Sequence, residues 1–155
     1  MKKIIFIMIS VSMLLYSTFN RDDTNGVVTD SKTGLIWQDD YSNDEDFSER
    51  PIWSHGVKSA SWAEAIDYCE ELTLGGNDDW RLPNRKELLS IVKYSAFEPS
   101  INSVFKSTPN PAYLIYWSST TANNDTSDAH IVDFAYGSTN KYSKHVGLYV
   151  RCVRG

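Results

Sequence analysis

The sequence lacks the short motifs that mark several common enzyme classes. Its three histidines, His55, His130 and His145, are far apart and form no H-E-x-x-H arrangement, so a zinc protease of that type is not expected. No G-x-S-x-G elbow surrounds a serine. No glycine loop with phosphate-binding spacing is present either. The histidines are therefore interpreted as surface or hydrogen-bonded residues, and no metal site is predicted from them.

The chain also lacks an excess of positive charge. Its 155 residues carry a formal net charge of −5, which becomes −7 if Lys2 and Lys3 are lost with an N-terminal leader. Binding to nucleic acid or to an anionic membrane needs a basic surface. Neither is predicted as a partner.

Long apolar runs are absent except at the N-terminus. Lys2 and Lys3 precede residues 4–15, which are apolar apart from two serines. This pattern is typical of a secretory signal and is short for a bilayer span. We predict a signal peptide over residues 1–19, with an uncleaved anchor as the alternative, and no membrane span once the leader is removed. The chain is then exported to the periplasm, to the cell surface or into the medium.

The remaining composition favours one domain over residues 20–155. The whole chain is 41% hydrophobic and 13% aromatic, which suffices for one core and is little for two. Eight glycines, five prolines and many Asn, Asp, Ser and Thr residues separate short apolar runs. The fold class predicted from this pattern is α+β, with two helices packed on short antiparallel strands in a loop-rich chain.

Cysteine is scarce, with Cys69 and Cys152 as the two copies. Two cysteines cannot supply a four-ligand zinc site, and no C-x-x-C redox motif is present. Because the chain is expected to be exported, a structural disulfide is predicted, and two buried free thiols are the alternative.

Two helices are predicted from their N-terminal caps. Ser61 and Glu64 have capping-box spacing, and the helix that they open is expected to run to about Thr73. Asn84 and Glu87 repeat the spacing before a second helix, expected over residues 85–93 with an apolar face of Leu88, Leu89, Ile91 and Val92.

The segment before the second helix is predicted to be a structural corner. Trp80 is expected in the core and Arg81 as a hydrogen-bonding hub. Pro83 favours an extended Leu82, and Glu87 closes the cap of the following helix.

Several short runs have the composition of strands. A hairpin is predicted from residues 27–28 and 35–38, which flank a Ser-Lys-Thr-Gly turn. Further antiparallel strands are predicted at residues 113–119, 131–134, 142–146 and 148–153. In the last of these, Leu148, Val150 and Cys152 would share one face, and Tyr149, Arg151 and Val153 the other.

Five motifs, taken together and in order, resemble one bacterial family. They are Thr29–Gln38 (T-D-S-K-T-G-L-I-W-Q), Trp62–Ala65 with Cys69, Asp79–Asn84 (D-W-R-L-P-N) with Glu87 and Leu88, Tyr116–Thr120 (Y-W-S-S-T), and Val150–Arg154 (V-R-C-V-R). They resemble the Lcl C-terminal domain family, named after a collagen-like adhesin of Legionella and long described as a domain of unknown function. The resemblance covers about residues 26–155.

The resemblance implies an exported domain with a C-type-lectin-like fold, of the variant related to formylglycine-generating enzymes. A disulfide from a helix to the last strand is a hallmark of such domains, and Cys69 and Cys152 fall where it would lie. In the collagen-like adhesin the domain is linked to binding of sulfated glycans and to cell attachment. This chain lacks a G-X-Y stalk, and its net acidity does not favour sulfated polymers as ligands.

A ligand-facing surface is predicted around residues 123–128. This stretch offers amide and carboxylate oxygens for sugar hydroxyls, and the neighbouring aromatic residues could stack on a sugar ring. The candidate residues are Tyr113, Tyr116, Trp117, Asn123, Asn124, Asp125 and Asp128. The alternative is that the aromatic rings belong to the core and that the loop is merely solvated.

No cofactor is predicted, and calcium has no supporting motif. The acidic run over residues 39–50 lacks EF-hand spacing and is interpreted as a solvated loop. Glu98-Pro99-Ser100 departs in its third residue from the Glu-Pro-Asn triplet with which sugar-binding C-type lectins hold calcium.

The sequence therefore predicts an exported, non-enzymatic binding module for a glycan or a surface protein. Two alternatives stay open, a diverged enzyme on the same fold and a structural envelope protein. The enzymatic alternative is weakened because formylglycine-generating relatives use a cysteine pair near their active site, whereas Cys69 and Cys152 are assigned to a structural bond.

Overall fold

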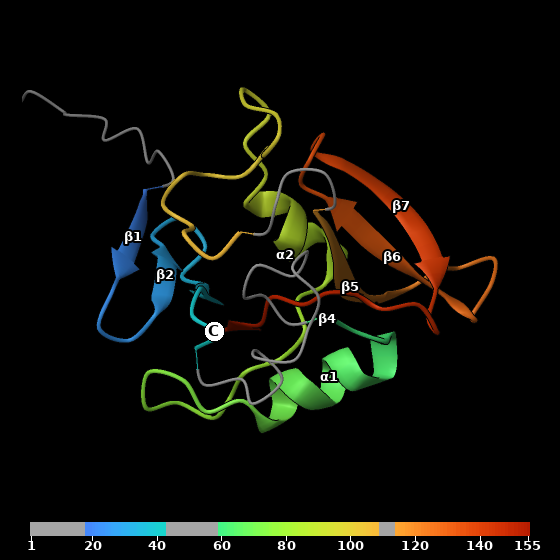
Figure 1. Ribbon diagram of the computed structural model, residues 1–155, viewed down its shortest axis with the longest axis horizontal. Helices are drawn as coiled ribbons and strands as arrows, with labels where there is room; N and C mark the ends of the chain where they lie inside the picture. Colours follow the sequence, from blue (N-terminus) through green and yellow to red (C-terminus); the bar gives the residue numbers. More distant parts are fainter. Residues whose placement is uncertain (1–17, 43–58, 109–113) are drawn as a thin grey trace, which may run out of the picture.

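The computed structural model describes residues 18–42, 59–108 and 114–155. Within these ranges the chain forms two sheets and two helices, which confirms the predicted α+β class (Figure 1). The sheet that contains β1 and β2 and the strands β5 to β7 lie on opposite sides of α2 in this view, and α1 runs below them.

The first sheet has the strand order β1-β2-β3-β9 and is antiparallel. Its strands are β1 (Phe19–Asp22), β2 (Val27–Asp30), β3 (Ile36–Gln38) and β9 (Val153–Arg154). The predicted hairpin of β2 and β3 is confirmed. Asp30 organises its turn, because its carboxylate accepts the Lys32 N–H at 2.9 Å and the Thr33 hydroxyl at 2.8 Å.

The second sheet has the order β4-β8-β5-β6-β7, and β5 and β8 are its parallel pair. Its strands are β4 (Ser59–Ala60), β5 (Ile115–Thr121), β6 (Asp128–Asp133), β7 (Ser138–Ser143) and β8 (Leu148–Tyr149). The strand predicted at residues 142–146 is displaced, because β7 ends at Ser143 and Val146 lies in the following turn.

The final strand predicted over residues 148–153 is split in two. Tyr149 in β8 pairs with β5, whereas Val153 in β9 pairs with Trp37 of the other sheet, so the segment crosses from one sheet to the other. The predicted alternation of its faces is nevertheless confirmed. Leu148, Val150 and Cys152 pack in one hydrophobic cluster, and Tyr149 and Val153 pack in a second one.

Both predicted helix starts are confirmed. Helix α1 spans Trp62–Glu71, and the Glu64 carboxylate accepts the Ser61 N–H at 2.8 Å. Helix α2 spans Arg85–Ser90 and is shorter than predicted. Two of the four residues predicted on its apolar face, Ile91 and Val92, follow its last residue. Ile91 is still buried in the core.

The predicted disulfide is present between Cys69 of α1 and Cys152, with the two Cα atoms 5.5 Å apart. Both residues are fully buried in a cluster that fills the space between α1 and the second sheet. Trp80 and Trp117 belong to this cluster, and Trp117 donates its indole N–H to the carbonyl of Ala60 at 2.9 Å. The bond therefore joins α1 to the chain segment that links the two sheets.

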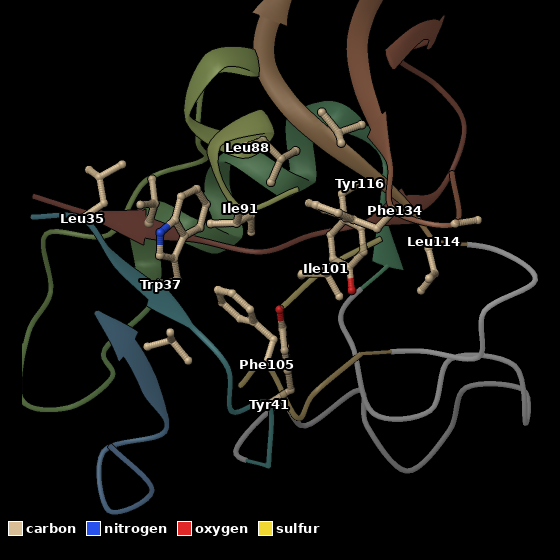
Figure 2. Packing of buried hydrophobic residues seen from close by; sticks show 14 residues of the cluster. Leu35, Trp37, Tyr41, Leu88, Ile91, Ile101, Phe105, Leu114, Tyr116 and Phe134 are labelled. Carbon is tan, nitrogen blue, oxygen red and sulfur yellow. The ribbon is translucent and has the colours of Figure 1, made fainter. Parts of the chain in front are cut away.

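The larger hydrophobic cluster lies between the two sheets. In Figure 2, Leu88 and Ile91 approach it from the α2 side, Trp37 from β3 and Tyr116 from β5. The ring centroids of Tyr116 and Phe134 are 5.3 Å apart in an edge arrangement. Predicted core positions of the second helix and of the strands thus meet in one interior.

A buried ion pair lies at the edge of this cluster. Arg151 and Asp39 are both fully buried, and Arg151 Nη1 lies 2.7 Å from Asp39 Oδ1. Arg151 also donates to the carbonyls of Gln38 at 2.7 Å and Ser107 at 2.6 Å, while Asp39 pairs with Arg21. The sequence predicted that Asp39 belongs to a solvated loop. This prediction is wrong, because Asp39 is fully buried. The rest of that acidic run, from residue 43, lies outside the described residues.

Candidate ligand-binding surface

The predicted loop at residues 123–128 is exposed and folds around Asp125. The Asp125 carboxylate accepts the backbone N–H of Ser127 at 2.9 Å and its hydroxyl at 2.6 Å. The Ser127 hydroxyl, followed by its backbone N–H, lowers the pKa of Asp125. Asp125 therefore has an evident role in shaping the turn that leads into β6.

Two other predicted residues of this loop contact Lys141 of β7. The Lys141 ammonium lies 3.3 Å from Asn124 Oδ1 and 3.7 Å from Asp128 Oδ2. The structure thus brings Asn124 and Asp128 together, with a cation on their oxygens. Asn123 is exposed beside them.

The predicted aromatic residues do not join this surface. Tyr116 and Trp117 are fully buried and belong to different hydrophobic clusters on opposite faces of β5. Burial raises the pKa of the Tyr116 hydroxyl. Neither ring has a face open to a ligand, and Tyr113 lies outside the described residues.

The residues predicted as a structural corner before α2 are joined by hydrogen bonds. Arg81 donates from both terminal nitrogens to the two carboxylate oxygens of Glu87, each at 2.8 Å. Glu87 also accepts the Asn84 N–H at 2.8 Å, which completes the cap. Burial alone would raise the pKa of Glu87, but these hydrogen bonds and the charge of Arg81 lower it overall. Trp80 is buried and donates to backbone carbonyls.

The same corner is fastened to both sheets. The backbone of Arg81 pairs with Val153 of β9, with both N–H to carbonyl distances at 2.9 Å. The Pro83 carbonyl accepts the N–H of Ser119 in β5 at 2.8 Å. The corner therefore connects the two sheets through backbone hydrogen bonds.

A different set of aromatic rings is exposed. Tyr94 and Phe97 follow α2, and Tyr136 lies in the turn between β6 and β7; their exposed fractions are 75%, 76% and 68%. We call Tyr94, Phe97 and Tyr136 the aromatic patch. The buried tyrosine rings pack in the hydrophobic core, whereas the three rings of the aromatic patch are exposed to solvent.

The two segments that carry the aromatic patch are bonded to each other. The Glu98 N–H donates to the Ala135 carbonyl at 2.8 Å, and the Ser100 N–H donates to the Phe134 carbonyl at 2.5 Å. The buried Ser100 hydroxyl donates to the Ala96 and Ala135 carbonyls, at 2.8 and 3.1 Å. Hydrogen bonds between the two segments therefore hold the backbone that carries these rings in place.

Close packing at Gly137 brings the patch together. A Cβ atom built on Gly137 would lie 2.9 Å from Val92 Cγ1 and 3.6 Å from Tyr94 Cδ1. Gly137 also has a φ of 66°, in the left-handed region. A glycine here lets the β6–β7 turn, which carries Tyr136, approach the segment after α2, which carries Tyr94.

None of the three residues of the aromatic patch was among the predicted site residues. Tyr94 and Phe97 follow the predicted second helix, and Tyr136 precedes a turn glycine. Aromatic residues next to turn residues, outside any apolar periodicity, were the available signal. The pairing of the two segments depends on tertiary contacts.

The described residues hold no group of three or more His, Cys, Asp or Glu side chains arranged to bind a metal ion. In the same part of the chain, no helix is both long and apolar enough to cross a bilayer.

Residues 26–154 match the model of the Lcl C-terminal domain. The chain belongs to this family. The Lcl C-terminal domain is associated with adhesins, which fits a binding module in general. A search of curated proteins gave no match. In this member of the Lcl C-terminal domain family, the exposed aromatic patch and the loop at residues 123–128 are the two candidate ligand-binding surfaces.

Proposed function

We propose that this Lcl C-terminal domain is an exported, non-enzymatic binding module that recognises a glycan through the aromatic patch. The observation that carries the proposal is the exposure of Tyr94, Phe97 and Tyr136 on two segments that are hydrogen-bonded to each other. The apolar faces of sugar rings stack on aromatic rings, and rings held by a rigid backbone lose little conformational freedom on binding.

Polar groups beside the patch suit the hydroxyls of a sugar. Tyr94 and Tyr136 carry phenolic hydroxyls, and Glu98 is exposed next to Phe97. Hydroxyl and carboxylate groups bond sugar hydroxyls in the directions that distinguish one sugar from another. The patch thus combines stacking area with hydrogen-bonding groups. The loop at residues 123–128 lacks the stacking area predicted for it, because Tyr116 and Trp117 are buried.

Export and the C-type-lectin-like fold remain predictions from the sequence. The N-terminal residues that suggest a leader lie outside the described part of the chain. The proposal needs an extracytoplasmic location, because the adhesin-type role requires access to surface glycans.

A glycan array probed with the purified protein, once with calcium and once with EDTA, tests the proposal. We expect retention on a restricted set of glycans, unchanged by EDTA. Tyr94→Ala, Phe97→Ala and Tyr136→Ala should each weaken binding by about tenfold, equivalent to about 1.4 kcal/mol. Tyr142→Ala is the matched control, since Tyr142 is 39% exposed on β7, outside the patch.

Variants of the loop at residues 123–128 separate the two surfaces. Asn124→Ala and Asp125→Ala should leave glycan retention within about twofold of the unaltered protein. Loss of binding in these variants, with the patch variants unaffected, would move the site to the loop. Retention that survives all three patch substitutions would refute the aromatic patch as the glycan site. A blank array would refute the glycan role and favour a protein ligand.

A further inference from the structure

The outer edge of the second sheet is formed by β7. Its six residues, Ser138–Ser143, pair with β6 in continuous register and include no proline. β7 is last in the strand order, so no strand lies on its other side among the described residues, and Figure 1 shows it along the outer side of β6. An edge strand carries unpaired N–H and C=O groups, which can pair with the backbone of another extended chain.

Two hydrogen bonds show which residues of β7 face outward. The His130 carbonyl accepts the Ser118 hydroxyl of β5 at 2.8 Å, so the backbone of His130 points toward β5 and away from β7. Lys141 lies opposite His130, and its N–H donates to the Asn140 side chain at 2.9 Å instead of to β6. Because backbone groups alternate in direction along an antiparallel strand, Thr139 points outward together with Lys141.

β7 has few of the features that protect the edges of natural sheets. Such edges are commonly closed by prolines, bulges or projecting charges. Lys141 is the charged residue of β7, and its ammonium lies 3.3 Å from Asn124 Oδ1 and 3.7 Å from Asp128 Oδ2 of the same molecule. The strand carries no carboxylate, although the chain has a net charge of −5. Two copies of this acidic chain can therefore approach along β7 without acidic residues of the two strands facing each other.

The other strands at the ends of the two sheets suit such pairing less well. β4 has two residues, and the backbone of Arg81 already bonds to β9. β1 ends at Asp22, which is followed by Asp23. Among the described edges, β7 is thus the longest, and it has no acidic residue.

We propose that two copies of this domain associate through their β7 strands, which pair antiparallel about a two-fold axis at Asn140. In this register the outward N–H and C=O groups of Thr139 bond those of Lys141 in the second copy. The Lys141 N–H exchanges its bond to Asn140 for one to the second copy. The two Asn140 side chains then lie opposite each other at the axis, where each amide can both donate and accept.

The paired strands form a small interface, so the association is reversible and weak. Tyr136 of the aromatic patch lies two residues before β7. Antiparallel pairing places the starts of the two β7 strands at opposite ends of the pair, so the dimer presents two aromatic patches. Two linked copies of one surface bind a repeating ligand more tightly than one copy does. The association itself does not depend on the glycan proposal.

Sedimentation equilibrium of the purified protein over a wide range of concentrations tests the association. We expect a monomer–dimer equilibrium. Asn140→Asp should weaken it by about fivefold, because two carboxylates then oppose each other at the axis while the Lys141 N–H keeps its acceptor. Thr139→Pro should abolish it, since this change removes an outward N–H and leaves the hydrogen bonds to β6 intact. Melting curves show that each variant is folded.

Cysteine crosslinking tests the register. Residues at non-hydrogen-bonded positions of antiparallel strands have Cα atoms about 4.5 Å apart, a distance that a disulfide can span. Asn140→Cys should therefore form a disulfide-linked dimer under mild oxidation. Ser138→Cys is the matched control, because Ser138 is exposed on the same strand and would lie about 13 Å from its counterpart.

Three results would each overturn the proposal. The first is a protein that stays monomeric up to about 1 mM, which would leave the edge to another partner or to none. The second is a dimer that neither Asn140→Asp nor Thr139→Pro weakens, which would place the interface elsewhere. The third is crosslinking of Ser138→Cys as fast as that of Asn140→Cys.

Discussion

Removal of the Cys69–Cys152 disulfide is expected to cause a large loss of stability. The bond joins residues 83 positions apart, and both ends are fully buried between α1 and the second sheet. Cys152 lies in the segment that passes from β8 to β9. The bond therefore restrains the unfolded chain over more than half of its length.

The magnitude follows from the entropy of the closed loop. For a loop of this length, the chain-entropy relation gives a stabilisation of about 4.5 kcal/mol at 25 °C. For a domain of this size, 1 kcal/mol corresponds to about 3 °C in melting temperature. Loss of the bond should thus lower the melting temperature by about 13 °C.

Calorimetry of three samples isolates this effect. The first is the oxidised protein, the second is the same protein reduced while unfolded and then refolded in reducing buffer, and the third is Cys69→Ala/Cys152→Ala. The reduced protein keeps both sulfur atoms, so it separates loss of the bond from loss of packing volume. The double variant should melt slightly below the reduced protein, because it also leaves small cavities.

A melting temperature of the reduced protein within about 3 °C of the oxidised one would refute this reasoning. In that case the unfolded chain would already be restrained by other means. The single variants Cys69→Ser and Cys152→Ser should behave like the double variant or worse, since each places a hydroxyl in an apolar cluster.

Two further stability predictions concern charged groups. Asp39→Asn leaves the fully buried Arg151 without its carboxylate, and should cost about 3–5 kcal/mol in urea unfolding, whereas Asp23→Asn at the exposed Asp23 should leave the urea midpoint almost unchanged. An Asp39→Asn protein as stable as the Asp23→Asn control would show that the buried pair is dispensable. Glu87→Gln should cost about 1 kcal/mol at pH 7, a modest figure because the Arg81 side chain is 41% exposed. Since the folded pKa of Glu87 is lowered, this contribution is present above its ordinary pKa and is lost as the pH falls through the folded value; a difference from Glu87→Gln that stays constant from pH 7 down to about pH 3 would contradict the assignment.

The elements with local chemical signals were predicted well. Both capping boxes lie within four consecutive residues, so the start of each helix could be located from the sequence alone. The Thr33-Gly34 turn likewise marks its hairpin locally. The end of α2 was less certain, because apolar residues continue past Ser90 and no glycine or proline follows at once.

The sites were predicted less well because exposure is a tertiary property. Tyr116 and Trp117 are adjacent in a strand, and their alternation alone indicates that they point to opposite faces. Only the presence of a packed cluster on each face of β5 shows that both rings are buried. The aromatic patch needs segments that the fold brings together, and no local spacing predicts it.

The sequence by itself determined the family, the α+β class, the helix caps, the cysteine pair and the alternating faces of the last segment. Most of these depend on residues close together in the chain, and the two cysteines had no other cysteine to pair with. The tertiary structure decided that the last segment divides between two sheets, that Asp39 is buried against Arg151, and that Gly137 packs against Tyr94. These features depend on contacts between residues far apart in the chain. Their free energies are determined by burial and by the geometry of the assembled fold, which a linear pattern does not contain.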